Sequence, residues 1–179
     1  MTDIKSHYQK HSKRIVLIFA FAGLIFYIFT AHKSYQADTK WTALLTSQLS
    51  DLEIKIANTQ SQIELFANSQ QKNSDALIQK RLSELKKSMR QHKQTIVETF
   101  SHQKIKNIAT ESTRKQFNAM SESLSMLTKQ IDQNGATSAE YLPGLKGLLI
   151  SLQKSLTMDL VKKRKQQRVF LFLVGVGLL

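Results

Sequence analysis

The chain has 179 residues, no cysteine and a formal net charge of +13 at pH 7. Without cysteine it can form neither disulfides nor thiolate metal sites, so a folded domain must depend on packing. The positive charge could suggest nucleic-acid binding, but much of it flanks two apolar segments, where anionic lipid headgroups are the nearest partner.

A short basic tail, residues 1–14, precedes the first apolar segment. Residues 15–31 carry no charge and are followed by Lys33. This length lies at the short end of the range for a spanning helix, and Arg14 and Lys33 can reach the headgroups. The segment therefore predicts an uncleaved transmembrane helix. A cleaved secretory signal is the alternative, but such signals have shorter apolar regions and a small residue where this chain has Phe29.

Long helices are predicted for residues 32–168. Residues 24–134 contain neither glycine nor proline, and apolar residues recur at alternating steps of three and four. Both features favour a helical bundle or coiled coil over a sheet. The seam residues are Leu45, Leu49, Leu52, Ile56, Ile63 and Phe66; Ile78, Leu82, Leu85, Met89, His92 and Ile96; Phe117, Met120, Leu124, Leu127 and Ile131; and Leu145, Leu149, Leu152, Leu156 and Leu160.

The boundaries of the predicted helices rest on signals of unequal strength. The helices are expected at about 32–68, 75–100, 106–132 and 141–168. Polar residues separate the first two, and Asn-Gly and Pro-Gly turn signals predict a loop at 132–144. Near residue 105 the seam becomes polar, yet its phase continues to Phe117, so one helix over 75–131 is the alternative. An even number of long helices returns the chain to the membrane it left, which favours four.

A second apolar segment, residues 169–179, follows a cluster of basic residues. Eleven residues rise about 16 Å as a helix, about half of a hydrocarbon core. We expect the start of a truncated second transmembrane helix. The predicted fold class is all-α, with an N-terminal transmembrane helix and an antiparallel helical bundle or coiled coil before this segment. The membrane-flanking basic residues, with the lipid bilayer as their partner, are Arg14, Lys33, Lys162, Lys163, Arg164, Lys165 and Arg168.

The basic residues disagree about orientation. Four precede the first span, whereas the twenty residues after it contain only Lys33 and Lys40. This difference favours a cytoplasmic N-terminus and an extracytoplasmic bundle, while the cluster at 162–168 favours the opposite. Because the first span usually sets the orientation and long loops cross regardless of charge, the bundle is predicted outside.

No group of residues predicts catalysis or cofactor binding. His92 and His102 are ten residues apart, about 280° around a helix, so they share no face for a metal ion. Ser88 and His92 could touch, but no acidic side chain orients the pair. We expect no enzyme, no catalytic residue, no cofactor, no metal and no nucleic-acid partner.

Two further features have structural explanations. Lys86, Arg90 and Lys93 form a basic stripe at helical spacing, which we expect to be a solvated outer face of the bundle. Tyr35 and Trp41 follow the first span directly and are expected at or near the membrane interface.

The order of these features resembles the N-terminal sensor region of bacterial transmembrane chemoreceptors and sensor kinases. The resemblance covers the whole chain: the basic tail, the span at 15–31, the helical domain at 32–168 and the segment from Val169. It rests on architecture and includes no sequence motif, so no ligand-contacting residue is carried over. It implies a homodimer that is joined through the helix seams and located in the bacterial inner membrane. The dimer would sense a small-molecule or protein ligand. A small displacement of the last helix would carry the signal, and an output module would follow residue 179.

The alternative function is structural. A membrane-anchored coiled coil could tether partners, with 162–179 as a basic interfacial anchor. Further apolar sequence and a signalling module after residue 179 would favour the sensor, and a stop at that point would favour the tether.

Overall fold

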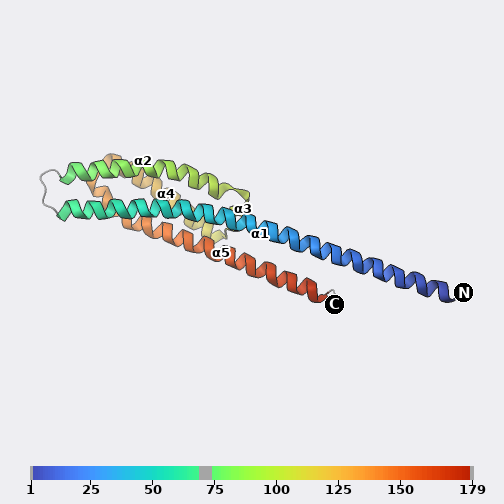
Figure 1. The fold of residues 1–179 in the computed structure, drawn as a ribbon. Helices are drawn as coiled ribbons and strands as arrows, with labels where there is room; N and C mark the ends of the chain where they lie inside the picture. The colour runs from blue at the N-terminus through green and yellow to red at the C-terminus, as the bar shows by residue number, and fades with distance from the viewer. Residues whose placement is uncertain (1, 69–73, 178–179) are drawn as a thin grey trace. The chain divides into compact units, whose positions relative to one another are not determined.

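The structure, a computed structural model, is helical through nearly all of its described backbone, residues 2–68 and 74–177 (Figure 1). Side chains are described at 14–67, 75–134, 137–170, 172 and 173. No strand occurs in these ranges, so the predicted all-α class is confirmed. The elements are α1 (Thr2–Asn68), α2 (Ser74–Ser101), α3 (Gln103–Lys106), α4 (Glu111–Asn134), the 3₁₀ helix η1 (Gly135–Tyr141) and α5 (Leu142–Gly177).

The chain forms two compact units. The central unit is Asp38–Val161, and the terminal unit combines the residues up to Ala37 with those from Lys162 onward. The chain passes from one unit to the other inside α1 and again inside α5. Both connections between the units are therefore helical, without an intervening turn.

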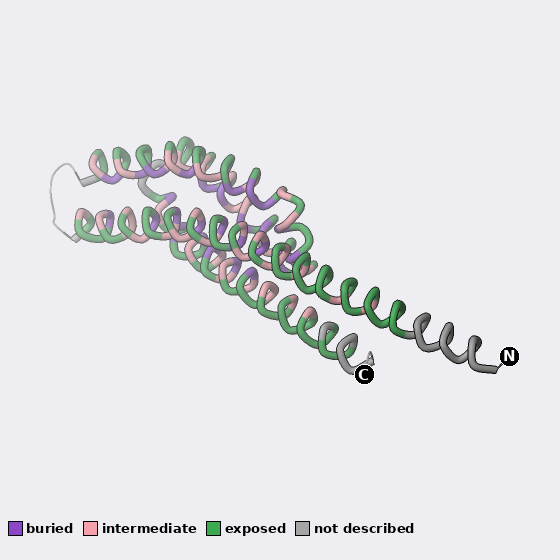
Figure 2. Tube along the Cα trace, turned by 45° about the vertical axis from the view of Figure 1, so that its right-hand side comes forward, coloured by how far each residue is buried: buried purple, intermediate pink, exposed green. Residues whose placement is uncertain are grey.

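One apolar core holds the central unit together. α2, α4 and the parts of α1 and α5 in this unit lie side by side, with their buried residues facing one another (Figures 1 and 2). Fully burying one leucine, isoleucine or methionine side chain contributes about 1.5–3 kcal/mol to the stability of the fold. The buried seam residues are Leu45, Leu49, Leu52, Ile56, Ile63, Ile78, Leu82, Leu85, Met89, Ile96, Phe117, Met120, Leu124, Leu127, Leu145, Leu149, Leu152 and Leu156.

The structure contains a turn near residue 105, as the favoured division into four helices expects, and not the alternative of one helix over 75–131. α2 ends at Ser101, and α4 begins at Glu111 rather than near residue 106. Between them, Ile105 and Ile108 are buried with 0% and 5% exposure. These two residues lie off the seam of α2, so a straight helix would point them away from the core. Their burial explains why the chain turns here although the seam phase continues to Phe117.

The prediction of a loop at 132–144 is wrong, because the structure has helices throughout that segment. α4 extends to Asn134, η1 follows, and α5 begins at Leu142 with Pro143 in its first turn. Proline is favoured there because the first amides of a helix need no partner within the helix. Ser138 and Leu142, both 0% exposed, hold the segment against the core. The polar break predicted between the first two helices falls mainly on 69–73, outside the described residues.

Candidate functional site

The apolar segment of α1 is exposed along its length in the terminal unit. Phe19 and Phe26 are 73% and 69% exposed, and no residue of the segment is buried, although Ala20, Leu24 and Ala31 are partly covered. The described part of the chain holds one helix long and apolar enough to cross a membrane, and an 18-residue window of Arg14–Ala67 has a mean hydropathy of 2.3. A helix that is apolar on all sides is covered either by protein or by lipid. No residue within this window is buried by protein, which makes association with a membrane the coarse functional conclusion.

A polar residue inside the apolar segment satisfies its hydrogen bonds within the helix. The Thr30 hydroxyl donates to the carbonyl oxygens of Phe26 and Tyr27 at 3.0 and 2.9 Å. Such bonding lowers the cost of placing a hydroxyl in an apolar environment. The Thr30 hydroxyl is thus satisfied without a partner outside the helix.

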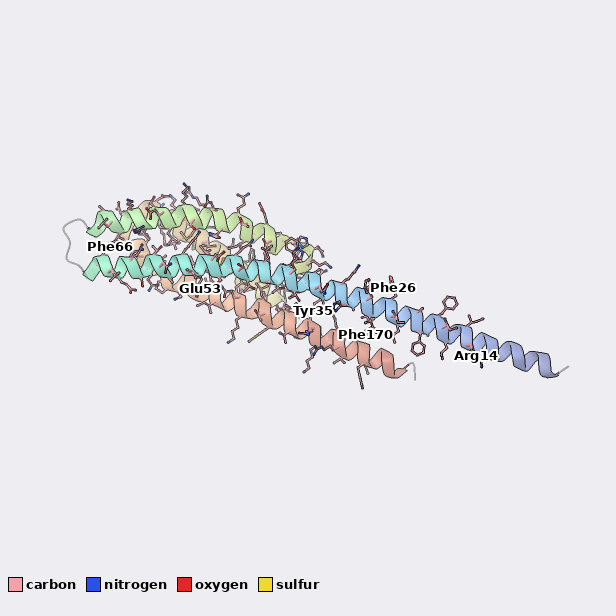
Figure 3. All side chains as sticks on the ribbon, viewed as in Figure 1. Arg14, Phe26, Tyr35, Glu53, Phe66 and Phe170 are labelled. Carbon is pink, nitrogen blue, oxygen red and sulfur yellow. The ribbon has the colours of Figure 1, made fainter. Side chains whose placement is uncertain are left out.

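α5 runs antiparallel to α1 in the terminal unit. The rings of Tyr27 and Phe170 are 5.5 Å apart between centroids, at an interplanar angle of 54°. Further along, Arg164 Cζ lies 4.8 Å from the centroid of the Tyr35 ring. Because the residue numbers rise on α1 while they fall on α5, the two helices have opposite directions here. Figure 3 labels Tyr35 and Phe170 on these neighbouring helices.

The membrane-flanking basic residues occupy different environments in the terminal unit. Arg14 is exposed at the N-terminal end of the apolar segment (Figure 3). At the other end, Lys33 Nζ lies 4.6 Å from the centroid of the Phe29 ring. In the cluster at 162–168, Lys163 is partly buried and the other four basic residues are exposed.

A groove lies between α1 and α5 in the terminal unit. Its volume is about 270 Å³, and it is lined by Ile28, Ala31, His32, Tyr35, Arg164, Gln167 and Arg168. The structure brings Arg164 and Arg168 together in this groove, whereas the other predicted basic residues do not line it. Sequence reasoning missed His32 and Gln167. The spacing of three and four residues on each helix, which places side chains on one face, was the available signal.

The prediction that Lys86, Arg90 and Lys93 form a solvated outer face is wrong for the two lysines, because both contact α4. Lys86 forms an ion pair with Asp132, and Lys93 Nζ donates to Ser125 Oγ at 2.6 Å. Only 16% of the Lys86 side chain is exposed. These lysines therefore join helices, and Arg90 is the member of the stripe that stays exposed.

A polar cavity of about 450 Å³ lies next to the Lys86–Asp132 pair. Its volume falls within the usual range for small-molecule sites, although such sites are mostly more apolar. Amide, hydroxyl and charged groups could bind a polar solute there. The lining residues are Gln79, Leu82, Ser83, Lys86, Ile131, Asp132, Gln133 and Asn134.

His92 has Lys55 as its partner. Lys55 Nζ donates to His92 Nε2 at 2.9 Å, which requires a neutral imidazole with this nitrogen unprotonated. Partial burial, followed by the Lys55 ammonium, lowers the pKa of His92 below the ordinary 6.5, and Asp51 acts weakly in the opposite direction. The described residues contain no group of three or more potential metal ligands.

Asp159 of α5 holds the beginning of α4. Its Oδ2 accepts from Thr110 N at 2.8 Å and from Thr113 Oγ1 at 2.6 Å. Asp159 thus satisfies an amide at the start of α4, where free N–H groups and the helix dipole favour a carboxylate. Nearby, the Trp41 ring stacks on His102 at 3.7 Å between centroids, so Trp41 packs within the central unit.

Comparison of the chain with protein family models, with curated proteins and with solved structures finds no match.

Proposed function

We propose that the chain is the input part of a bacterial transmembrane signal-transduction receptor, located in the inner membrane. The observation that supports this most is the antiparallel pairing of α5 with the apolar segment of α1. Phe170 contacts Tyr27 and Arg164 contacts Tyr35, so the beginning of the second apolar segment, on α5, lies beside the C-terminal end of the first apolar segment, on α1. In this proposal both helices enter one bilayer.

The central unit is, in this proposal, an antiparallel four-helix bundle on the extracytoplasmic side. The excess of basic residues before the first span supports a cytoplasmic N-terminus. The shared core of α1, α2, α4 and α5 supports the bundle. The polar cavity beside Lys86 and Asp132 is a place where a small solute could bind.

Signal transfer is proposed to occur through displacement of α5 relative to α1, because shifts of this kind are a known switching mechanism. α5 leaves the central unit without a turn, so a displacement at Val161 is transmitted to the residues that follow. The contacts of Asp159 with Thr110 and Thr113 hold α5 just before this point. A ligand that moves α5 must therefore either break these hydrogen bonds or move the start of α4 together with α5.

The proposed homodimer needs a surface other than the helix seams. The seam residues Leu45 and Leu49 are 0% exposed within a single chain, so a second copy cannot contact them. Ile54 and Leu65 are 53% and 68% exposed on α1. They are eleven residues apart and about 20° apart around the helix. We place the dimer contact on this outer face of α1.

Single cysteines test the orientation, because the chain has none of its own. We expect a membrane-impermeant maleimide to label Thr137→Cys in intact cells, and Ser12→Cys only after permeabilisation. Thr137 is exposed in the central unit, so its labelling depends on location and not on burial. Protection of Thr137→Cys in intact cells would place the central unit in the cytoplasm and contradict the proposed orientation.

The alternative, a tethering protein with 162–179 on the membrane surface, makes a different prediction for Phe172. Its side chain is 69% exposed in the protein, so only lipid can protect it. We expect Phe172→Cys to resist a maleimide in reconstituted vesicles and to react after detergent is added. Rapid reaction in intact vesicles would support the interfacial anchor of the tether.

A hybrid receptor tests signalling. In it, α5 continues into the kinase module of a sensor kinase, and Tyr27→Cys with Phe170→Cys allows the two helices to be locked. We expect kinase activity to differ between the oxidised and the reduced hybrid, because locking prevents displacement. The same hybrid without cysteines is the control for oxidation. Equal activity in both states would contradict transmission through these helices.

A further inference from the structure

We propose that the groove between α1 and α5 in the terminal unit binds the headgroup of an anionic phospholipid. This inference rests on the proposed insertion of both helices into a membrane. It adds a specific lipid site to that proposal, formed by Arg164 and Arg168 together with Tyr35.

The groove changes from apolar to polar along α1. Ile28 and Ala31 line one end, and Tyr35 lines the other. Seven residues of helix separate Ile28 from Tyr35, which corresponds to about 10 Å along the axis. A lipid molecule that lies against α1 shows the same change in polarity, because its acyl chains are apolar and its headgroup is polar.

Two arginines of α5 line the groove, Arg164 beside Tyr35 and Arg168 one turn closer to Ile28. Arg164 and Arg168 are four residues apart, so they occupy the same face of α5, and their like charges repel each other. Neither has a carboxylate partner among the side chains that the structure describes. A phosphate group neutralises both charges and matches the planar donor arrangement of arginine.

Tyr35 positions one of these groups. Arg164 Cζ lies 4.8 Å from the centroid of the Tyr35 ring, a cation–π contact that limits the movement of the guanidinium. The N–H groups at the edge of a stacked guanidinium can still donate. Arg164 is thereby held against the Tyr35 ring beside the groove that both residues line, whereas a lysine ammonium on a flexible stem would be held less firmly.

The surroundings favour a lipid over a free anion. Ile28 and Phe29 are 47% and 55% exposed beside the groove, so apolar surface continues from it along α1. An inorganic phosphate leaves this surface uncovered, whereas acyl chains cover it. The Gln167 side chain and the His32 ring can donate to hydroxyl groups of a glycerol headgroup.

The lysines of the same cluster provide a matched control. Lys162 and Lys165 are exposed on α5 and do not line the groove. Lys162→Gln with Lys165→Gln removes the same charge from the same helix as Arg164→Gln with Arg168→Gln. Non-specific attraction to an anionic surface therefore weakens equally in both double variants, and only a specific site separates them.

The experiment measures which lipid the full-length chain retains. The purified protein is equilibrated with equal amounts of phosphatidylglycerol and phosphatidylcholine in detergent, and the bound lipid is identified by native mass spectrometry. Wild type and the lysine variant should retain phosphatidylglycerol with a preference on the order of tenfold. The arginine variant should lose most of this preference. Circular dichroism checks that all three proteins keep their helical content.

Three outcomes overturn the lipid site. One is equal loss of preference in the arginine and lysine variants, and another is unchanged preference in the arginine variant. The third is displacement of the bound phosphatidylglycerol by inorganic phosphate, which shows a general anion site. Flotation with phosphatidylcholine vesicles separates this inference from the proposed function. A chain that floats without a phosphatidylglycerol preference refutes only the lipid site, whereas a chain that does not float refutes the membrane placement itself.

Discussion

Individual polar residues connect helices that are far apart in the sequence. A single oxygen of Asp159 accepts hydrogen bonds from Thr110 and Thr113, and Lys55 of α1 donates to His92 of α2. Hydrogen bonds to charged groups are stronger than those between neutral groups, and they are costly to leave half formed. Three of these residues, Asp159, His92 and Lys55, lead to predictions at the scale of the side chain.

Replacing Asp159 is expected to destabilise the central unit. Asp159→Ala removes the acceptor for the Thr110 amide and the Thr113 hydroxyl, so the free energy of unfolding should fall by about 1–3 kcal/mol. Urea unfolding followed by circular dichroism measures the change. Glu122→Gln is the control, because Glu122 is exposed on α4, and it should change stability by less than about 0.5 kcal/mol. Equal effects of both variants would argue against the contacts of Asp159.

His92 should make the protein less stable at acidic pH. Because the fold lowers the pKa of His92, the unfolded chain binds the proton more readily. This contribution to stability is therefore complete above pH 6.5, the ordinary value, and is lost as the pH falls through 6.5 toward the lowered pKa. The decrease in unfolding free energy over this interval should be smaller in His92→Gln than in wild type.

Lys55→Gln tests the cause of the lowered pKa. Without the Lys55 ammonium, only burial lowers the pKa of His92, so an NMR titration should show a higher value than in wild type. The value should remain below 6.5, because burial is the larger cause. An unchanged titration would mean that the contact between Lys55 and His92 does not exist in solution.

The helices themselves follow from local spacing. The alternation of three and four steps at Leu45, Leu49 and Leu52 places these residues on one face, and all three are buried. The turn near residue 105 has a weaker local signal, which is the change to polar residues along the seam. It depends on Ile105 and Ile108, which find a place in the core only when the chain reverses. Local spacing predicts a helix well, but it predicts poorly where a helix must stop.

The two faces of α5 should respond differently to substitution. Leu152 is 0% exposed and Ile150 is 45% exposed, two residues apart on the same helix. Leu152→Ala should lower the free energy of unfolding by about 2–5 kcal/mol, because it leaves a cavity in the core. Ile150→Ala should change it by less than about 0.5 kcal/mol. Urea unfolding of both variants measures the contrast. Similar losses would contradict a buried position for Leu152 and an exposed position for Ile150.

At the scale of the whole molecule, two units are joined by two helices. Hydrogen bonds and an ion pair connect different helices in the central unit, whereas the terminal unit exposes apolar surface around α1. This division separates a part with a buried apolar core from a part whose apolar side chains are exposed. The contacts between α1 and α5 in the terminal unit are the basis of the proposed function, so they need a direct test.

Disulfide formation tests the pairing of α1 with α5 in membranes. The Tyr27 and Phe170 side chains face each other, with ring centroids 5.5 Å apart, so Tyr27→Cys with Phe170→Cys should form an intrachain disulfide in higher yield than a mismatched pair under mild oxidation. The control pair combines Phe21→Cys with Phe170→Cys, because Phe21 lies about 9 Å from Tyr27 along α1, toward the N-terminus. Gel mobility with and without reductant reports the bond. Equal yields for both pairs would indicate that the helices do not keep this register.

The sequence by itself determined the helical class, the apolar segment at 15–31 and the seams that form the core. Each of these depends on residues within one or two turns of one another, and side chains at those spacings share a face in any helix. Only the tertiary structure decided the bounds of the turn near residue 105, the contacts of Asp159 with the start of α4 and the groove that Arg164 and Arg168 share with Tyr35. These features join residues far apart in the chain, and local spacing carries no information about which distant helix a side chain meets.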